Sequence, residues 1–270
     1  MPPKPFDLEA RHALVTGCGS AAGIGFATAR MLSRLGARVS LTSTTERIRD
    51  RAAELGEDAF PFVADLTDRA QAFALVAAVR DAHGAIDLLV NAAGMVQTGF
   101  EAAEAPFAEL SPAALDRQLE ITLKTAFHVT QAVLPEMVER GHGRVVMVSS
   151  VTGPLVTAPG SAAYATSKGA MDALMRTIAI EHGRAGVTAN SVAPGVDRDR
   201  VLGDRRSSCR PAHANRATGD ARRGRCARRV PLLGRGELHN RPVDRGRRWQ
   251  HHPGAARHRS VRRRVGSRWI

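Results

Sequence analysis

A tyrosine and a lysine four residues apart are the side chains of this sequence that most directly suggest chemistry. Tyr164 is the only tyrosine of the chain, and Lys168 follows it in the run SAAYATSKGA. If this run is helical, positions i and i+4 share one face, so the lysine ammonium lies near the phenol and favours its ionised form by charge attraction. A phenol in this setting can exchange protons near neutral pH. An exposed amphipathic helix start is the alternative interpretation of an isolated YxxxK, so other motifs must decide.

A glycine-rich run, TGCGSAAGIG, occupies residues 16–25 between an apolar run and a helical pattern. Glycines let the backbone approach a pyrophosphate closely, and the start of the following helix offers free N–H groups and the positive end of its dipole. A tight turn that binds no ligand is the alternative. We predict phosphate binding by Gly17, Gly19, Gly23, Ile24 and Gly25.

The elements that position these residues follow from hydrophobic patterning. Between residues 11 and 194, short β-branched runs alternate with longer helical patterns, as in βαβ units around a parallel sheet. The longest helices are predicted at about 112–140 and 162–183. The fold class is therefore α/β, a doubly wound parallel sheet of the Rossmann type with helices on both faces. Strands are predicted at 12–16, 38–42, 59–63, 86–90, 143–149 and 186–193.

Charge divides the chain into two unlike parts near residue 195. The formal net charge of +13 arises after that point. Residues 196–270 contain 22 arginines, no lysine and 6 acidic residues, whereas residues 1–195 contain 17 basic and 20 acidic residues. The second part is also poor in large aliphatic residues, which is typical of a disordered segment. We predict a Rossmann-type dinucleotide-binding and catalytic domain at 1–195 and an arginine-rich, disordered tail at 196–270.

The sequence shows no pattern of a signal peptide, a membrane-spanning helix or a disulfide framework. The N-terminal run MPPKPFDLEARH has no apolar stretch, and no later apolar run is long enough to cross a bilayer. The three cysteines, Cys18, Cys209 and Cys226, are too few and too scattered for disulfides or a metal site. We therefore expect a cytoplasmic protein with no membrane partner and no metal.

Taken in order along the chain, five motifs resemble those of the short-chain dehydrogenase/reductase family. They are the glycine turn, an aspartate after the third strand (Asp65), NAAG after the fourth (91–94), a serine after the fifth (Ser150) and YxxxK. The match spans residues 11–195 and is most similar to the β-ketoacyl-carrier-protein-reductase-like branch. The glycine turn is two residues longer than the commoner family pattern. The resemblance implies an NAD(P)(H)-dependent oxidoreductase that transfers hydride between nicotinamide and a small ketone or secondary alcohol.

The resemblance assigns catalytic roles to four residues. Tyr164 would be the general acid/base for the substrate oxygen, and Lys168 would support its ionisation and hold the nicotinamide ribose. Ser150 would hydrogen-bond the substrate oxygen, although it lies one residue further from Tyr164 than expected. The fourth position, an asparagine that supports a water relay to the lysine, aligns with Thr122, so we expect a weakened or rerouted relay. A helix hydroxyl bonded to its own backbone is the alternative for Thr122.

The same resemblance assigns further residues to the cofactor. Asp65 would accept a hydrogen bond from the adenine amine, and an N-cap of the helix that starts near Asp68 is the alternative or additional role. Asn91 and Gly94 would line the adenine-ribose side. The full set of these further cofactor residues is Ser43, Thr44, Arg47, Asp65, Leu66, Asn91, Ala92, Gly94, Tyr164, Lys168, Pro194 and Gly195.

Cofactor choice depends on the end of the second strand, LTSTTERIR. An acidic side chain there would bind the adenosine ribose hydroxyls and exclude a 2′-phosphate. Ser43, Thr44 and Thr45 carry hydroxyls without negative charge, and Arg47 can face a phosphate. We therefore favour NADP(H), with NAD(H) as the alternative. Arg47 fits a solvated helix residue equally well.

After VTANSVAPG the sequence does not continue the family pattern of a substrate segment, a further helix and a final strand. A one-base shift of reading frame accounts for the change. Under that shift the codons of GELHNRPVDRGRRWQHH, residues 236–252, can encode ASYITGQSIVVDGGNII, a typical family ending. The shift also explains arginine without lysine, because CGN codons arise readily in GC-rich text. We hypothesise that residues 196–270 are a frameshift product and that the C-terminal strand and helix of the fold are missing.

Two other functions remain as alternatives. A catalytically impaired remnant would bind nucleotide but lack the wall of the substrate site, with the sixth strand as an unprotected edge. A basic-tailed nucleic-acid binder would show non-specific, salt-dependent phosphate affinity, and we expect no specific nucleic-acid partner. The resemblance also implies a homo-oligomer paired through the two long helices, whereas a tetramer would need the altered C-terminus.

Overall fold

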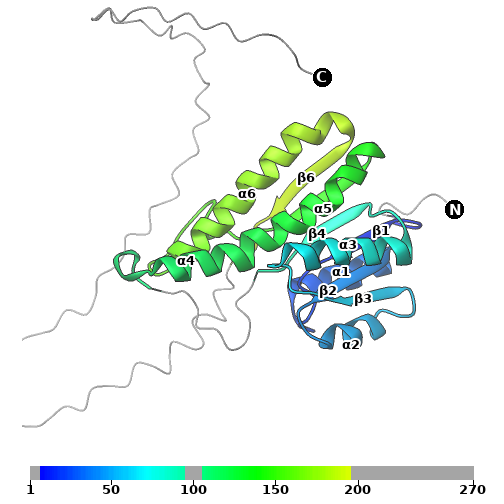
Figure 1. Ribbon diagram of the computed structural model, residues 1–270, viewed down its shortest axis with the longest axis horizontal. Coiled ribbons are helices and arrows are strands. Elements are labelled where there is room, and N and C mark those ends of the chain that lie inside the picture. The colour runs from blue at the N-terminus through cyan, green and yellow to red at the C-terminus, as the bar shows by residue number, and fades with distance from the viewer. Residues whose placement is uncertain (1–6, 95–104, 196–270) are drawn as a thin grey trace, which may run out of the picture. The chain divides into compact units, whose positions relative to one another are not determined.

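A six-stranded parallel sheet forms the centre of the described part of the chain (Figure 1). The computed structural model describes residues 7–94 and 105–195. The strand order is β3-β2-β1-β4-β5-β6, and every neighbouring pair is parallel. All six predicted strands are confirmed, each within two residues of its expected bounds. The strands are β1 (His12–Val15), β2 (Arg38–Ser43), β3 (Ala59–Val63), β4 (Leu88–Asn91), β5 (Gly143–Val148) and β6 (Val187–Val192).

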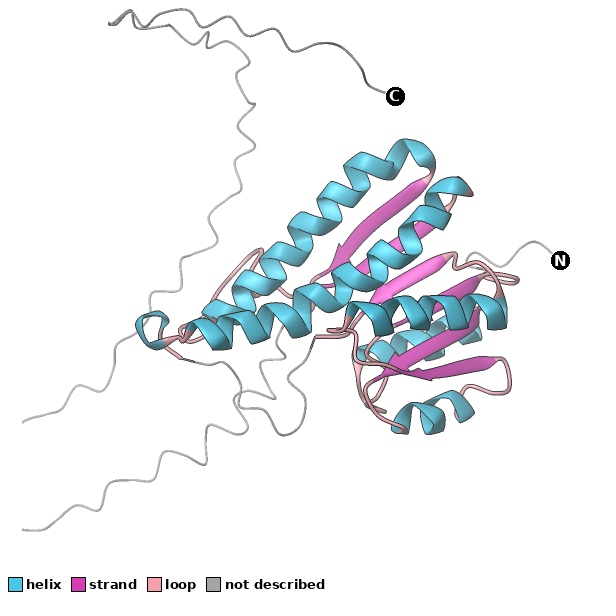
Figure 2. Cartoon of the chain, viewed as in Figure 1, coloured by secondary structure: helices cyan, strands magenta, loops and turns pink. Residues whose placement is uncertain are grey.

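Helices lie on both sides of the sheet, as Figure 2 shows. α1 and α2 pack on one face, and α3, α5 and α6 pack on the other. This arrangement confirms the predicted doubly wound fold. The helices are α1 (Ile24–Arg34), α2 (Arg47–Ala53), α3 (Arg69–His83), α4 (Pro112–Leu119), α5 (Thr125–Glu139) and α6 (Ala162–His182).

Alternation along the strands divides the core into two apolar layers. In β1 the side chains of Ala13 and Val15 join the layer under α1 and α2, whereas Leu14 joins the layer under α3, α5 and α6. Successive strand residues point to opposite faces, so a strand covered on both faces reads as a continuous apolar run. Burial of both layers fixes the register of the strands and therefore the positions of their carboxyl ends.

The helix predicted at 112–140 is interrupted. α4 begins after Ser111, whose hydroxyl accepts a hydrogen bond from the Ala114 N–H at 3.2 Å. It then passes into a π-helical turn at Glu120–Lys124 before α5 begins. A π-turn adds a residue to the helical repeat and is often found at functional sites. Here it lies where the chain passes the carboxyl ends of the strands.

β3 and β6 are the two edge strands of the described sheet. β3 contains Pro61, which lacks an N–H and is tolerated because β3 pairs only with β2. Beyond β6 the described chain ends at Gly195. The α1 face over β4, β5 and β6 carries an apolar groove of about 240 Å³, lined by Leu32, Leu88, Val146, Val148 and Val192 among others. The predicted loss of a final helix and strand concerns residues outside the described part of the chain.

Candidate active site

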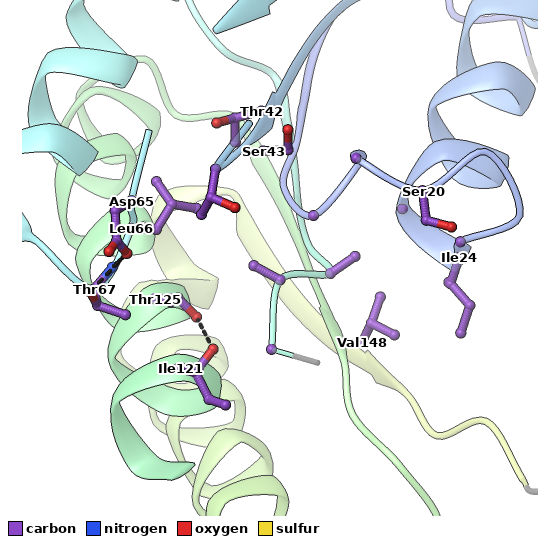
Figure 3. A pocket seen from close by; sticks show the side chains of 18 of the residues that line it. Ser20, Ile24, Thr42, Ser43, Asp65, Leu66, Thr67, Ile121, Thr125 and Val148 are labelled. Carbon is purple, nitrogen blue, oxygen red and sulfur yellow. Dashed lines mark hydrogen bonds between the residues drawn. The ribbon is translucent and has the colours of Figure 1, made fainter. Parts of the chain in front are cut away.

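A cavity of about 570 Å³ opens at the carboxyl ends of the strands, where the strand order turns from β1 to β4. Ligands of open parallel sheets bind at such a switch point. Figure 3 shows side chains from β2, the β3–α3 loop, the π-turn and α1 around this space. Nearly all the predicted site residues line it: Gly17, Gly19, Gly23, Ile24, Gly25, Ser43, Thr44, Arg47, Asp65, Leu66, Ala92, Gly94, Ser150, Tyr164, Lys168, Pro194 and Gly195.

The glycine turn after β1 has no room for side chains. Gly17 has φ +71°, and a Cβ there would lie 2.7 Å from the Ala92 carbonyl. A Cβ at Gly25 would lie 2.6 Å from the Gly17 oxygen. α1 begins after Gly23 with no side-chain cap and no acidic residue in its first turn. Its N–H groups and positive dipole end are therefore available to an anion, which fits the pyrophosphate of a dinucleotide.

Thr16 holds the NAAG turn against the glycine turn, a role that the sequence did not reveal. Its hydroxyl oxygen accepts hydrogen bonds from the N–H groups of Ala92 and Ala93 at 3.0 and 3.1 Å, and it lies 3.4 Å from the Val90 carbonyl. The position of Thr16 directly before the first glycine was the signal in the sequence that could have indicated this role. The contact fixes the backbone of Ala92 and Gly94 at the cavity wall.

Lys168 is buried on α6 at the cavity wall. Its Nζ donates a hydrogen bond to the Val148 carbonyl at the end of β5 at 2.7 Å. Burial lowers the pKa of Lys168 to about 8, and the carboxylate of Asp172 one turn further on opposes that shift. The ammonium is therefore still charged at neutral pH but titrates only a little above it.

Tyr164 lies half-buried one turn before Lys168 and lines the same cavity. The Lys168 Nζ is 5.8 Å from the centre of the Tyr164 ring, so the predicted i, i+4 neighbourhood is present in the structure. Ser150, which follows β5, accepts a hydrogen bond from the Thr152 N–H at 3.1 Å. Ser149 also lines the cavity, but its hydroxyl lies 3.4 Å from the Lys168 carbonyl oxygen. Ser150 thus has its hydroxyl hydrogen free for a ligand.

The end of β2 presents hydroxyl groups and one guanidinium to the cavity. The Ser43 hydroxyl donates to the Thr45 carbonyl at 2.9 Å, which turns the chain toward α2. Thr44, Thr45 and Arg47 are exposed, and the Arg47 Nε donates to the Thr45 hydroxyl at 3.3 Å. Arg47 is therefore both solvated and part of the cavity lining, so the two predicted roles are compatible.

Asp68, and not Asp65, takes the N-cap role that the sequence left open for Asp65. Asp68 is the N-cap of α3 and accepts from the Ala70 and Gln71 N–H groups. Asp65 instead accepts hydrogen bonds from the N–H and the hydroxyl of Thr67, at 3.0 and 2.7 Å. Figure 3 shows the contact between these two residues as dashes. The N-cap alternative for Asp65 is wrong, because the helix starts three residues later than that role requires. Asp65 remains beside the cavity together with Leu66.

Two predicted site residues do not line the cavity. The Asn91 amide points into the core and donates to the Thr130 hydroxyl at 2.9 Å. Thr122 is fully buried in the π-turn, and its hydroxyl contacts Gln118 and the Gly94 carbonyl. The alternative role, a hydroxyl bonded to its own helix backbone, is not what Thr122 shows. Ile121 in the π-turn and Thr125 at the start of α5 line the cavity instead.

The described residues show little beyond this site that could carry other chemistry. Cys18 is buried and burial raises the pKa of its thiol, so it is not a reactive thiolate. Within residues 7–94 and 105–195, no group of three or more His, Cys, Asp or Glu side chains could hold a metal ion. None of the helices in these residues is both long and apolar enough to span a bilayer.

The parallel sheet and the cavity at its switch point fit a dinucleotide-binding protein, and comparison with known proteins shows the family. Residues 11–207 match the family model described as short chain dehydrogenase. The oxidoreductase UcpA of Salmonella typhimurium is 39% identical over 194 residues, which are 71% of each protein. Gluconate 5-dehydrogenase of Gluconobacter oxydans is 36% identical over 198 residues, or 72% of this chain and 73% of that one.

Solved structures extend the likeness to the whole described fold. A gluconate 5-dehydrogenase from Burkholderia cenocepacia in complex with NADP and tartrate has a TM-score of 0.65 and 33% identity, covering 74% of this chain and 77% of its own. An NAD⁺-bound xylitol dehydrogenase has a TM-score of 0.63 and 32% identity, covering 71% and 72%. The chain belongs to the short-chain dehydrogenase family. It is an NAD(P)(H)-dependent oxidoreductase that interconverts alcohols and carbonyl compounds.

Proposed function

We propose that Tyr164 moves the proton in this reaction and that Lys168 and Ser150 assist it. The observation that carries the proposal is that all three side chains line one cavity with the glycine turn. The nicotinamide cofactor supplies or accepts the hydride when bound. Tyr164 gives a proton to the carbonyl oxygen in reduction or takes it from the alcohol in oxidation.

The charge of Lys168 supports both tasks of the site. Its Nζ lies 5.8 Å from the centre of the Tyr164 ring, so we infer that its charge assists proton transfer by the phenol. Its bond to the Val148 carbonyl fixes the ammonium at the wall of the cavity, where it can donate further hydrogen bonds to ribose hydroxyls. Ser150 donates its free hydroxyl hydrogen to the substrate oxygen, which steadies the charge that develops there.

NADP(H) is the proposed cofactor. The β2 end contributes Ser43, Thr44, Thr45 and Arg47 to the cavity, and Asp65 is the only acidic residue among the described lining residues. Asp65 follows β3, and Glu46 at the β2 end does not line the cavity, so Arg47 is the charged side chain that the β2 end offers to a 2′-phosphate. NAD(H) stays the alternative, since related structures contain either nucleotide.

The substrate is a small ketone or secondary alcohol. Relatives named for their substrates act on gluconate or on a succinyl-CoA derivative, so a polyhydroxy acid and an acyl thioester are both reasonable members of a test panel. Membership of the β-ketoacyl-carrier-protein-reductase-like branch remains a prediction. Turnover of an acyl thioester ketone in preference to sugar acids would support that branch.

Nucleotide binding and turnover test the proposed function together. Fluorescence of NADPH should change on binding to the full chain, and a panel of ketones should then oxidise it. The variant Gly17→Ala tests the site, because a Cβ at this position would collide with the Ala92 carbonyl and distort the glycine turn. Loss of NADPH binding in this variant supports the site. A wild-type chain that binds no nicotinamide nucleotide would contradict it.

The division of the chain at residue 195 and the frameshift are part of the same proposal. The family match reaches residue 207, and the aligned relatives are covered over 71–73% of their length. The apolar groove over β4, β5 and β6 is the kind of surface that a further packed segment covers. Expression of the gene with its frame restored should raise the midpoint of thermal unfolding by several degrees, about 2–4 °C per kcal/mol gained. An unchanged midpoint, with independent sequencing that finds no shifted base, would contradict the frameshift.

Pairing of two copies through α5 and α6 is the assembly that we propose. Phe127 on α5 and Ile180 on α6 are exposed apolar side chains, which a helix-to-helix interface would bury. Sedimentation of the full chain should give a dimer. A monomer at micromolar concentration would contradict this pairing.

A further inference from the structure

A buried amide near the end of α4, one helical turn before Thr122, is bonded to the Thr122 hydroxyl. Gln118 has 4% of its surface exposed and Thr122 has none. The Gln118 Nε2 lies 2.8 Å from the Thr122 Oγ1. Neither side chain lines the cavity, so neither can be assigned by contact with a ligand. Buried polar groups that are joined in this way fix each other's orientation.

The direction of these hydrogen bonds follows from the groups themselves. Thr122 Oγ1 also lies 3.2 Å from the Gly94 carbonyl oxygen, which can only accept. A hydroxyl has a single hydrogen, so Thr122 donates it to Gly94 and must accept from Gln118. The Gln118 amide therefore orients the Thr122 hydroxyl toward Gly94.

Gly94 is the point where this polar chain reaches the cavity. It lines the cavity with φ +133°, and a Cβ there would lie 3.2 Å from the Thr122 Cα. On its other side, the NAAG turn is held by Thr16 through the Ala92 and Ala93 N–H groups. The turn is thus fixed from both sides, by Thr16 before the glycine turn and by Thr122 in the π-turn.

We propose that Gln118 is a positioning residue for the nucleotide site, acting through Thr122 on Gly94. The proposal rests on the nicotinamide-dependent function argued above. At the position where the family resemblance implies an asparagine, this chain has the hydroxyl of Thr122, which is bonded to a glutamine amide from the preceding turn. The pair holds the π-turn at the cavity wall, where Ile121 and Thr125 line it.

A change of Gln118 to glutamate tests the direction of the bond with almost no change in shape. The ionised carboxylate of Gln118→Glu can only accept, so Thr122 would turn its hydrogen away from Gly94. The protonated carboxyl can donate, as the amide does. NADPH affinity of Gln118→Glu, measured by fluorescence between about pH 5 and pH 9, should therefore show a transition that the wild type lacks. We expect about tenfold weaker binding on the alkaline side and recovery to within about twofold on the acid side.

Variants of Thr122 separate positioning from simple packing. Gln118→Met should weaken binding at every pH, and Thr122→Val should have a similar effect. The double variant should be no weaker than Thr122→Val alone, because the amide acts through the hydroxyl. Thr122→Ser keeps the hydroxyl and should bind like the wild type. If Gln118→Met does not fold, the pH profile of Gln118→Glu decides alone.

The outcomes distinguish this inference from the proposed function. Parallel pH profiles for wild type and Gln118→Glu, or additive losses in the double variant, would overturn the role of Gln118 while nucleotide binding stands. A new transition in a chain that binds NADPH but turns over no carbonyl would support the role of Gln118 and contradict the proposed reaction. A wild type that binds no nicotinamide nucleotide would overturn both.

Discussion

The Nζ of Lys168 donates a 2.7 Å hydrogen bond to the Val148 carbonyl and lies 5.8 Å from the centre of the Tyr164 ring. The end of β5 therefore holds the ammonium that acts on a side chain one turn earlier in α6. Sheet and helix together fix the charge next to the phenol. This relationship links the fold to the chemistry of the site.

The pH dependence of activity should report Lys168. Burial places its pKa at about 8, so the charge that assists Tyr164 is present below that pH and lost above it. We expect kcat/KM of the wild type to fall as the pH rises through about 8, since this parameter reports groups of the free enzyme. A profile that stays flat to about pH 10 would show that the charge is not needed.

The same burial should make Lys168 costly for stability. Its pKa in the folded protein is lower than the usual lysine value of 10.5, so folding disfavours the charged form and stability increases as the pH rises from about 8 toward 10.5. Lys168→Met should raise the free energy of unfolding at pH 7 by about 1–3 kcal/mol while it abolishes turnover. Urea unfolding measures the first effect. A large loss of stability would mean that the bond to Val148 outweighs the burial of the charge.

Arg47 should control the choice between the two nucleotides. Loss of its charge in Arg47→Ala should raise KM for NADPH by about tenfold or more and leave KM for NADH almost unchanged. The matched control is Arg49→Ala, because Arg49 lies on the same helix, pairs with Glu46 and does not line the cavity. Steady-state kinetics with both nucleotides measures the ratio. Equal effects of the two substitutions would contradict the proposed preference.

His12 should make the fold sensitive to acid at the end of the sheet opposite the site. Its ring nitrogens contact the Gly84 carbonyl and the Ser40 hydroxyl, each at 2.9 Å, and burial lowers its pKa. A histidine whose folded pKa is lowered contributes stability above about pH 6.5 that is lost as the pH falls below it. The loss should reach at most about 1.4 kcal/mol per pH unit for this group.

The variant His12→Asn checks that assignment. Its amide can also donate and accept hydrogen bonds but does not titrate in this range. Urea unfolding from about pH 7.5 to pH 5 should give a shallower loss than in the wild type. His83 lies beside His12 with a lowered pKa of its own, so a residual slope is expected. Identical slopes would show that the pKa of His12 does not change on folding.

Much of the fold could be predicted because its strands are apolar on both faces. The runs around Leu14, Leu89 and Val145 are buried from above and below, and each ends in a turn that the sequence marks with glycine, asparagine or serine. The Tyr164–Lys168 pair and the glycine turn could be predicted as well, since their spacing reflects local backbone geometry. These features depend on neighbours in the sequence.

The features that escaped prediction depend on contacts between distant residues. The cofactor role of Asn91 stays a prediction, but the direction of its side chain could not be predicted: the amide bonds Thr130 in the core, because the side chain alternates to the α5 face at the end of β4. Gln118 and the π-turn were missed because an ordinary helical period continues across 112–140 in the sequence. Thr16 was missed because its partners, Ala92 and Ala93, lie more than seventy residues away.

Turnover by the wild type and by Tyr164→Phe tests the central claim most directly. The full chain is incubated with NADPH and a panel of ketones, and with NADP⁺ and the matching secondary alcohols, while the absorbance of reduced nicotinamide is followed. We expect turnover by the wild type and a loss of about 10²–10⁴-fold in kcat/KM in Tyr164→Phe, with NADPH affinity retained. A Tyr164→Phe chain that turns over as fast as the wild type would contradict the account.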